Sequence, residues 1–464
     1  MKNPVLKKLA TLTAIVILLM LGLMRIESVV RDRILHRNLA TQSVAQSLAG
    51  PQTLLGPLLH MACVESWDVI ETQRNERKLT ERRQERTHTL VPSELKFAGE
   101  ALPQTLRRGL HPVQTYLLKG NIQARWNDLA TLRPAPTEKN SRMQCGTPIV
   151  MLAVSDTRGL RGVQLLHNGH AQPLKAGTFH PVYSRGLHAP LPADASQTGA
   201  PLELELQLEL AGTEQVALVP LGEHTDVHLR SAWPHPSFGG QFLPTEREVR
   251  PSGFDATWRL SALATTAAQD VLSSKPLCAP SWREEADIDG DGMGSNEPAN
   301  CVQSIRVRLM DPINPYTLAD RATKYGLLFV VLTFVAVGLV ELLQRRAVHP
   351  VQYLLVGCAL SAFFLLLLSL SEHLAFAQAY ALASAACIVL LTYYATHMLG
   401  HWLRGVLLGA GIALLYGVLF VLLRLEQTAL VVGSVALFAV LTTIMVLTRK
   451  VNWYGFDSNN KITT

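Results

Sequence analysis

Charged residues are scarce in this chain. Only 17% of its 464 residues are Asp, Glu, Lys or Arg, whereas 48% are hydrophobic. Soluble domains carry about 25% charged residues, so this deficit excludes an ordinary soluble enzyme. The deficit is also uneven, because residues 325–448 are almost continuously apolar while residues 27–320 have the polarity of a soluble domain. The composition therefore indicates a membrane-embedded part joined to a solvated part.

Common catalytic motifs are missing as well. The chain has no Gly-x-Ser-x-Gly elbow, Walker loop, His-Glu-x-x-His or Cys-x-x-Cys. The segment Trp233–Phe242 places His235 beside Ser237, with Glu246 and Glu248 nearby, but a nucleophile needs its base within hydrogen-bond reach. Two prolines bracket the histidine, which favours a rigid turn whose aromatic side chains pack into the domain core. We therefore assign no catalytic residue.

Six apolar runs have about the length that spans a bilayer. The first, Leu9–Met24, follows a lysine-rich start, and no Ala-x-Ala site comes after it, so the sequence predicts a retained anchor rather than a cleaved signal. The other five runs are Tyr325–Leu343, Val351–Leu370, Phe376–Ala395, Leu403–Leu423 and Thr428–Leu447. Short polar connections separate them, which predicts antiparallel neighbours in a compact bundle.

The distribution of Lys and Arg predicts the orientation of the spans. With the N-terminus inside, the cytoplasmic segments carry the basic residues Lys2, Lys7, Lys8, Arg345, Arg346, Arg404, Arg449 and Lys450. We expect an anchor at 1–26, a periplasmic domain at 27–320, a five-helix bundle at 325–448 and a cytoplasmic tail at 449–464. The net charge of +6 then reflects this topology. The sequence has no basic helix with interleaved aromatic residues, so it does not predict nucleic-acid binding.

The external region has the pattern of a mainly-β domain. Leu202–Leu210 alternates apolar and polar residues strictly, which predicts a half-buried strand. Val216–Val219 and Val227–Leu229 predict two further strands. Many short strands separated by Gly and Pro turns favour a sandwich or a partly open barrel.

Three other external segments have recognisable patterns. Val150–Val154 and Val163–Leu166 flank Asp156–Gly159, which predicts a hairpin or a tight turn. Val29–Leu48 has spaced apolar residues and is expected to continue the first span as an amphipathic helix. Glu71–Arg86 alternates Glu, Arg and Gln, which suggests either an exposed hairpin tip or a docking surface for anionic envelope polymers.

The six cysteines divide between the two parts of the chain. Cys358 and Cys387 lie in predicted spans, where a thiol is an ordinary packing residue. The other four lie in the external domain, which favours disulfides if that domain is in an oxidising compartment. Cys278 and Cys301 enclose one segment and are the natural first pair, which leaves Cys63 with Cys145. Four cysteines allow three connectivities, so the sequence leaves this choice open.

An acidic segment between Cys278 and Cys301 is typical of a calcium loop. Alternating carboxylates followed by Gly can fold their oxygens around Ca²⁺. The expected ligands are Asp287, Asp289, Asp291, the backbone carbonyl of Met293, and Glu297. Glu297 is the eleventh residue of the loop, Pro298 occupies the twelfth, and flanking helices are not evident, so the segment resembles dockerin or thrombospondin type 3 loops. The alternative is an acidic insertion without an ion.

Several segments together resemble one known family. They are Gly50–Pro57, Asp156–Gly159, Trp233–Phe238, Phe242–Glu248, Gly253–Trp258, Asp320–Tyr325, His349–Gly357, Leu370–His373 and Trp453–Tyr454. In this order they resemble the CreD family of inner-membrane proteins, which is linked to cell-envelope integrity in Gram-negative bacteria. The resemblance implies an inner-membrane location, a large periplasmic loop and a place in the regulon of a two-component sensor system. It implies no catalytic residues, and the acidic segment is not part of its pattern.

Three functions stay open at this point. The first is a non-enzymatic membrane protein that supports envelope integrity through protein or polymer contacts of its periplasmic domain. The second is an envelope hydrolase or transferase that acts through the His235 region. The third is a small-solute or lipid transporter, although ionisable residues near the middle of the spans are not evident.

Overall fold

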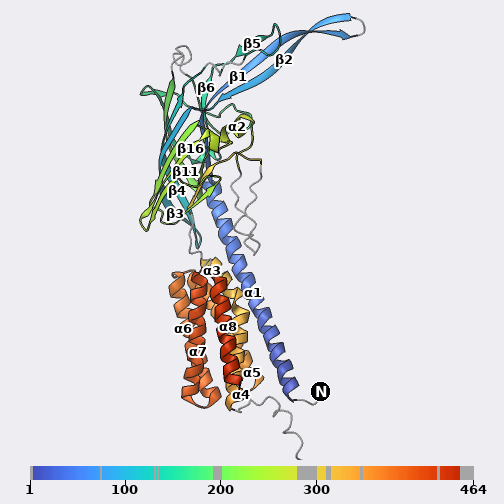
Figure 1. The fold of residues 1–464 in the computed structure, drawn as a ribbon, viewed down its shortest axis with the longest axis vertical. Helices are drawn as coiled ribbons and strands as arrows, with labels where there is room; N and C mark the ends of the chain where they lie inside the picture. Colours follow the sequence, from blue (N-terminus) through green and yellow to red (C-terminus); the bar gives the residue numbers. More distant parts are fainter. Residues whose placement is uncertain are drawn as a thin grey trace, which may run out of the picture. The chain divides into compact units, whose positions relative to one another are not determined.

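The structure is a computed structural model that describes residues 4–73, 76–129, 132, 135–191, 201–278, 300–309, 315–344, 348–425 and 429–449. The chain forms two compact units: Met1–Asn38 with Ile313–Thr464, and Leu39–Pro312. Helix α1 (Pro4–Ser47) runs without a break from the first unit into the second (Figure 1). The predicted helical continuation through Val29–Leu48 is thus confirmed, while the membrane boundary at residue 26 stays a prediction.

The first unit consists of α1 and a bundle of apolar helices. The helices of the bundle are α3 (Pro315–Lys324), α4 (Gly326–Gln344), α5 (Pro350–Ser371), α6 (Phe376–Leu399), α7 (Trp402–Arg424) and α8 (Ala429–Thr448). Among the described residues, four helices are long and apolar enough to cross a membrane, or five if α3 and α4, bent by 44°, form one span. Helix α8 is a shorter apolar helix, so the count of six spans stays a prediction.

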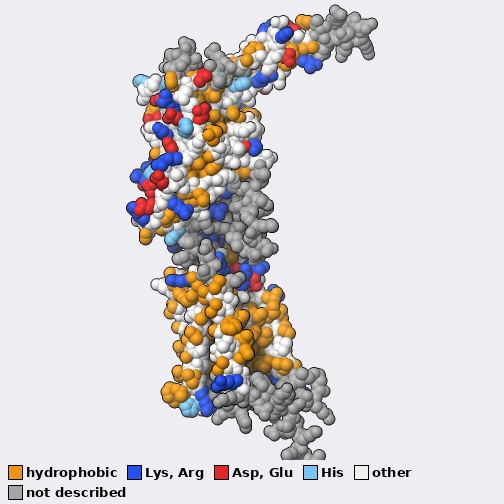
Figure 2. All heavy atoms as spheres, viewed as in Figure 1, with side chains coloured by type: hydrophobic (Ala, Val, Ile, Leu, Met, Phe, Trp, Pro, Cys, Tyr) orange, Lys and Arg blue, Asp and Glu red, His pale blue; other side chains and the backbone are white. Residues whose placement is uncertain are grey.

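The surface of the bundle is apolar, which suits contact with lipid tails. Leu355, Leu390 and Leu414 are 50%, 55% and 70% exposed, and hydrophobic side chains cover much of the bundle in Figure 2. Its interior is aromatic. The ring of Phe363 lies 4.6 Å from that of Tyr416, and the hydroxyl of Tyr380 donates to the backbone oxygen of Tyr416 at 2.7 Å.

The second unit contains two β-sheets. In the described residues one sheet has nine strands, in the order β14 (Pro236–Gly240), β17 (Ile305–Leu309), β12 (Gln215–Leu218), β1 (Gln52–Gln73), β6 (Ile149–Val154), β10 (Gly186–Pro190) and β9 (Lys175–Ala176), while β2 (Glu76–Leu90) and β5 (Arg142–Cys145) also pair with β1. The other has eight, in the order β15 (Glu246–Arg250), β16 (Gly253–Ser261), β13 (His224–Ser231), β3 (Glu94–Arg108), β4 (His111–Trp126), β11 (Leu202–Thr213), β7 (Leu160–His167) and β8 (His170–Gln172). The short helices η2 (Thr157–Gly159), η3 (Ala262–Ala264) and α2 (Ala267–Leu272) connect them.

The two sheets share one hydrophobic core. Leu55 and Met151 from the nine-stranded sheet belong to the same buried cluster as Leu204 and Trp258 from the eight-stranded sheet. The predicted alternation in β11 is confirmed, because its even-numbered leucines from 202 to 210 are buried. Alternate side chains of this strand point to the same face of the sheet, and these leucines form part of the core.

The turn between β6 and β7 decides between the two predicted alternatives. The two strands do not form a hairpin, because β6 pairs with β1 and β10 whereas β7 pairs with β11 and β8. The alternative, a tight turn, is right: Thr157–Gly159 form one turn of 3₁₀ helix, and Asp156 caps it. The turn carries the chain from one sheet to the other.

The predicted hairpin around Glu71–Arg86 is confirmed, since β1 and β2 pair from Leu59↔Leu90 to Gln73↔Glu76.

Candidate functional site

The end of helix α1 is held by the turn that precedes β7. The guanidinium of Arg158 donates to the backbone oxygens of Gln46 and Ala45, the latter at 3.4 Å. These oxygens belong to the last turn of the helix, where carbonyl groups lack helical partners and the helix dipole is negative. Arg158 therefore caps α1 from a loop more than 100 residues away in the chain.

The carboxylate of Asp156 ties the same turn to the segment that leaves the helix. Its Oδ2 accepts from the backbone N–H of Gly50 at 3.1 Å and lies 2.6 Å from Nη2 of Arg158. Burial opposes ionisation of Asp156, but hydrogen bonds from Arg158 and Gly50 outweigh it, so the pKa of this carboxyl is lowered. The side-chain amide of Gln52 donates to the backbone oxygens of Asp156 and Ala211 at 3.0 and 3.1 Å.

Gly159 completes this junction because no larger residue fits there. A Cβ on Gly159 would lie 2.2 Å from the backbone oxygen of Ala211 and 2.3 Å from Nε2 of Gln52. The segments Gly50–Pro57 and Asp156–Gly159, which are far apart in the sequence, thus meet at one place. We call residues Ala45–Gln52 and Asp156–Gly159 the helix junction.

The face of the eight-stranded sheet that points away from the core carries a polar array. We call it the outer polar face; its residues are Glu100, Lys119, Asn121, Gln207, Glu209, His228 and Arg230. Arg230 pairs with Glu100 at 3.1 Å, and Lys119 pairs with Glu209 at 3.2 Å. They line a hollow of about 860 Å³, to which Ala98 and Gly162 contribute small residues. Figure 2 shows acidic and basic side chains intermingled on this unit.

Glu65 on β1 sits in a cage of hydrogen-bond donors. Its side chain is 0% exposed and accepts from the hydroxyl of Ser141 at 2.6 Å, the N–H of Glu138 at 3.0 Å, and the N–H and hydroxyl of Thr137 at 2.8 and 2.7 Å. Arg86 Nε lies 3.3 Å away. The Ser141 hydroxyl, followed by the Glu138 N–H and the Thr137 hydroxyl, lowers the pKa of Glu65 to about 2. The caged carboxylate therefore fixes residues 137–141 to the sheet.

A disulfide reinforces the same place. Cys63 on β1 and Cys145 on β5 are register partners, and their sulfur atoms are bonded. The sequence predicted this pair as the one left over once Cys278 was paired with Cys301. The disulfide and Glu65 together tie both ends of residues 137–145 to β1.

Two buried histidines pack together, and one of them, His60, belongs to β1. His60 and His180 are 1% and 4% exposed, with ring centroids 5.1 Å apart. Nδ1 of His180 accepts from the N–H groups of Val182 and Tyr183, so its remaining proton is on Nε2. Burial, followed by the neighbouring His60, lowers the pKa of His180 to about 4. Burial also lowers the pKa of His60, with a smaller contribution from His88.

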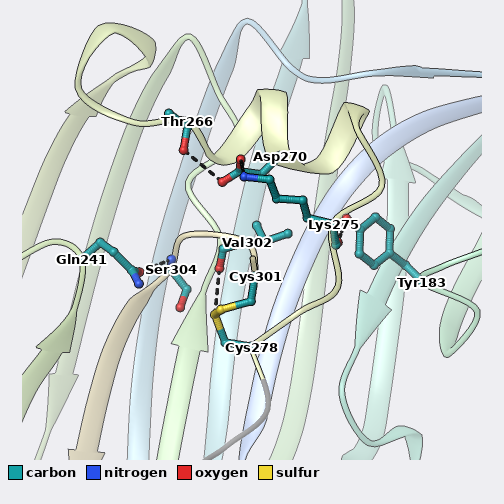
Figure 3. Close-up of a disulfide and its surroundings, with 9 residues drawn as sticks. All are labelled: Tyr183, Gln241, Thr266, Asp270, Lys275, Cys278, Cys301, Val302 and Ser304. Carbon is teal, nitrogen blue, oxygen red and sulfur yellow. Dashed lines mark hydrogen bonds and ion pairs between the residues drawn. A yellow bond between two sulfur atoms is a disulfide. The ribbon is translucent and has the colours of Figure 1, made fainter. Parts of the chain in front are cut away.

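The second disulfide closes the acidic segment. Figure 3 shows Cys278 bonded to Cys301, with Sγ of Cys278 3.3 Å from the backbone oxygen of Val302. Nearby, Lys275 pairs with the buried Asp270 at 2.6 Å, and the hydroxyl of Tyr183 donates to the backbone of Lys275. The predicted calcium ligands Asp287, Asp289, Asp291, Met293 and Glu297 lie outside the described residues. Within the described ranges, no group of three His, Cys, Asp or Glu could hold a metal.

Within the membrane unit, two ion pairs hold α1 against the bundle, one near the start of the helix and one farther along it. Lys8 pairs with Glu341, and the hydroxyl of Tyr353 donates to the same carboxylate at 2.9 Å. Farther along the helix, Arg33 lies 3.4 Å from Glu372, whose side chain is 11% exposed. These partly buried pairs fix the register of α1 on α4 and α5.

Between these pairs, a leucine of α1 fills a space left by a glycine. A Cβ on Gly357 of α5 would lie 2.1 Å from Cδ1 of Leu19 and 3.1 Å from the ring of Phe334. Leu19 is 5% exposed, so α1 packs closely here. Close approach through glycine is a common way for membrane helices to pack.

His235 directly precedes strand β14. His235 is exposed, and the indole of Trp233 donates to its backbone oxygen at 3.1 Å. Glu246 and Glu248 pair with Arg259 and Arg250. The aromatic side chains Trp233, Phe238 and Phe242 pack against the core, as predicted, although Pro236–Gly240 is a strand and not a turn.

Sequence reasoning missed the two best-built polar clusters. Neither the capping role of Arg158 nor the cage of Glu65 was predicted, because the bonded residues are 112 and 76 positions apart in the sequence. One signal was present: Glu65 is the first charged residue of a mostly apolar strand, and a carboxylate there is unusual unless it is hydrogen-bonded.

These features define a class: a multi-pass membrane protein in which one long helix joins an apolar bundle to a mainly-β domain with two disulfides. The sequence profile described as "Inner membrane protein CreD" matches residues 4–454. The chain is 33% identical to "Inner membrane protein CreD" of Escherichia coli (strain K12) over 459 residues, which cover 98% of this chain and 95% of that protein. The chain therefore belongs to the CreD family of inner membrane proteins.

Solved structures add nothing to this assignment. An M1 zinc metallopeptidase from Deinococcus radiodurans is 10% identical, with 47% of this chain and 42% of that chain covered and a TM-score of 0.20. A two-domain M1 zinc metallopeptidase mutant bound to L-tryptophan is 12% identical, with 36% and 39% covered and a TM-score of 0.17. Scores this low carry no argument about fold or function.

Proposed function

We propose that this protein is a non-catalytic inner-membrane protein that supports cell-envelope integrity. Its mainly-β domain lies in the periplasm and binds an envelope protein or polymer through the outer polar face. The observation that carries this proposal is the hollow of about 860 Å³ on that face. Small residues form part of it and long polar side chains surround it.

The chemistry of the outer polar face suits a polar, uncharged or mixed-charge ligand. Its Arg230 and Lys119 are already paired with Glu100 and Glu209, so the face has little net charge to attract a polyanion. Its amides, Asn121 and Gln207, supply both donors and acceptors. Glycan or peptide groups that present hydroxyls and amides could therefore exchange hydrogen bonds with it.

The cysteines support a periplasmic location for this domain. Both disulfides lie in the mainly-β unit, while the free cysteines Cys358 and Cys387 lie in the bundle. Disulfides persist in oxidising compartments such as the periplasm. We propose both termini in the cytoplasm and six spans. A reporter fused after Tyr454 should then be active in the cytoplasm, and periplasmic activity would overturn this topology.

The binding proposal can be tested by filling the hollow. Ala98 points outward from β3, so Ala98→Trp should block the hollow without disturbing the core. In a strain that lacks the native gene, A98W should fail to restore envelope protection at a normal protein level. Glu203→Trp, an outward position on β11 outside the hollow, is the matched control and should restore it. Full protection by A98W would contradict the proposal.

A catalytic alternative acting through His235 is tested in the same strain. We expect His235→Ala to restore protection fully, because the carboxylates near it pair with arginines. Loss of protection by H235A, with a normal protein level and a normal melting temperature, would favour an enzyme instead.

A further inference from the structure

The hairpin that joins β3 and β4 has an unusual tip. Arg108 and His111 are register partners, so the turn consists of only Gly109 and Leu110. Gly109 has φ +62°, which such a tight turn needs. Polar residues are usual at this position in hairpins, yet Leu110 is 58% exposed there.

The tip combines apolar and basic side chains. Leu106 is 41% exposed, and Arg107 and Arg108 are exposed beside it. In the described part of the chain no carboxylate pairs with either arginine. Exposed leucines flanked by arginines are typical of a segment that inserts at the surface of an anionic membrane. We call residues Leu106–Leu110 the hairpin tip.

The hairpin projects from one end of the mainly-β unit. The pairing of β4 with β11 ends at Thr115↔Thr213. On the other side of β4, Thr115 is paired with Gln104 of β3. Beyond this level β3 and β4 continue as two strands for four residue pairs, which is about 13 Å. In the described part of the chain, neither strand pairs with a third strand at the hairpin tip, although Val113 and His111 on β4 are buried.

The chain enters and leaves this unit at the same end. Ala49, just after α1, accepts a hydrogen bond from Thr213 at 2.7 Å, so it lies at the level where β11 stops. The N–H of Leu309, the last residue of β17, donates to the backbone oxygen of Glu214 at 2.8 Å. Both connections to the membrane helices therefore start beside the base of the hairpin.

We propose that the hairpin tip binds the headgroup region of the bilayer that holds the protein. Leu106 and Leu110 enter the interface, while Arg107 and Arg108 pair with lipid phosphates. The domain would then have a second membrane contact besides its two chain connections. This inference needs only the membrane location, so it stands or falls independently of the outer polar face.

A photocross-linking experiment on the full-length protein tests this contact. The photoreactive residue p-benzoylphenylalanine is placed at position 110, and the protein is reconstituted in nanodiscs that contain phosphatidylglycerol. We expect lipid adducts, detected by mass spectrometry, at position 110. Position 263 is the control, because Leu263 is 99% exposed but follows β16 at the opposite end of the sheet, where Ser261 pairs with His224. Its adduct yield should be at least tenfold lower.

Neutralising the arginines tests the electrostatic part. Arg107→Gln and Arg108→Gln should each lower the adduct yield at position 110 by roughly five-fold in anionic nanodiscs. The melting temperature should not change, since both side chains are exposed. Equal adduct yields at positions 110 and 263, a yield unaffected by both substitutions, or adducts with a second protein chain in place of lipid would each overturn the proposal.

Discussion

Arg158 and Asp156 form an ion pair of 2.6 Å that serves two elements at once. Arg158 donates to carbonyls in the last turn of α1, and Asp156 accepts from the N–H of Gly50, three residues after the helix ends. A local pair in one turn thereby joins the membrane helix to both sheets.

Breaking the helix junction should destabilise the mainly-β unit. We expect Asp156→Ala to lower the free energy of unfolding by about 2 kcal/mol, because the N–H of Gly50 loses its partner. Arg158→Ala should cost about 1 kcal/mol, since its side chain is 53% exposed and solvent weakens the pair. Denaturant unfolding of the full chain in detergent, followed by tryptophan fluorescence, measures both. Arg161→Ala on β7 is the exposed control, and equal stability of D156A and R161A would contradict the role of the junction.

Removing the charge of Glu65 should release residues 137–145. In Glu65→Gln the amide would face the donors that now point at a carboxylate, so hydrogen exchange of this segment should accelerate. Because the pKa of Glu65 is lowered to about 2, its contribution to stability is present above its ordinary pKa of 4.5 and is lost as the pH falls toward 2. Glu85→Gln, an exposed position opposite Val64, is the control. Unchanged exchange in E65Q would show that the disulfide alone holds the segment.

The buried histidine pair should make the mainly-β unit sensitive to acid. The pKa of His180 is lowered from 6.5 to about 4, so the unfolded chain binds more protons between these values. Stability is full above pH 6.5 and falls as the pH drops to 4, by on the order of 3 kcal/mol. His180→Asn keeps an acceptor for the N–H groups of Val182 and Tyr183 and should flatten the pH dependence of the melting temperature. The exposed His170→Asn should leave it unchanged, and a slope in H180N equal to wild type would refute this assignment.

Packing of α1 on the bundle should depend on Gly357. We expect Gly357→Ala to lower the free energy of unfolding by about 1–3 kcal/mol, because its Cβ would overlap Leu19. Leu19→Ala should restore part of that loss in the double variant, which a double-mutant cycle measures as a coupling energy. Gly417→Ala is the matched control, since nothing lies within 4 Å of its Cβ position. Additive effects of G357A and L19A would argue against direct packing.

Calcium binding by the acidic segment stays a prediction from the sequence. The Cys278–Cys301 disulfide brings the ends of this segment together, with their Cα atoms 4.9 Å apart. Calorimetry with Ca²⁺ alone on the full chain should show heat of binding. That heat should vanish in Asp289→Ala and persist in Asp255→Ala, a substitution on strand β16. Equal heat in D289A and wild type would exclude the proposed ligand set.

Much of the architecture follows from local pattern. Apolar runs long enough to span a bilayer predicted the helices, and the strict alternation of Leu202–Leu210 predicted β11 and its buried face. The turn at Asp156–Gly159 was predicted only as a hairpin or a tight turn. Local spacing cannot say whether two strands on either side of a turn pair with each other, because pairing depends on which sheet each strand joins.

The sequence by itself determined the division of this protein into an apolar bundle and a mainly-β domain. Burial of apolar side chains sets that division. Apolar residues alternate with polar ones in the strands and form long uninterrupted runs in the spans, and both patterns are visible in the sequence. Only the tertiary structure decided the helix junction, the cage of Glu65 and the projection of the hairpin tip. Each of these depends on hydrogen bonds or register between residues distant in sequence, and such contacts exist only after the sheets have assembled.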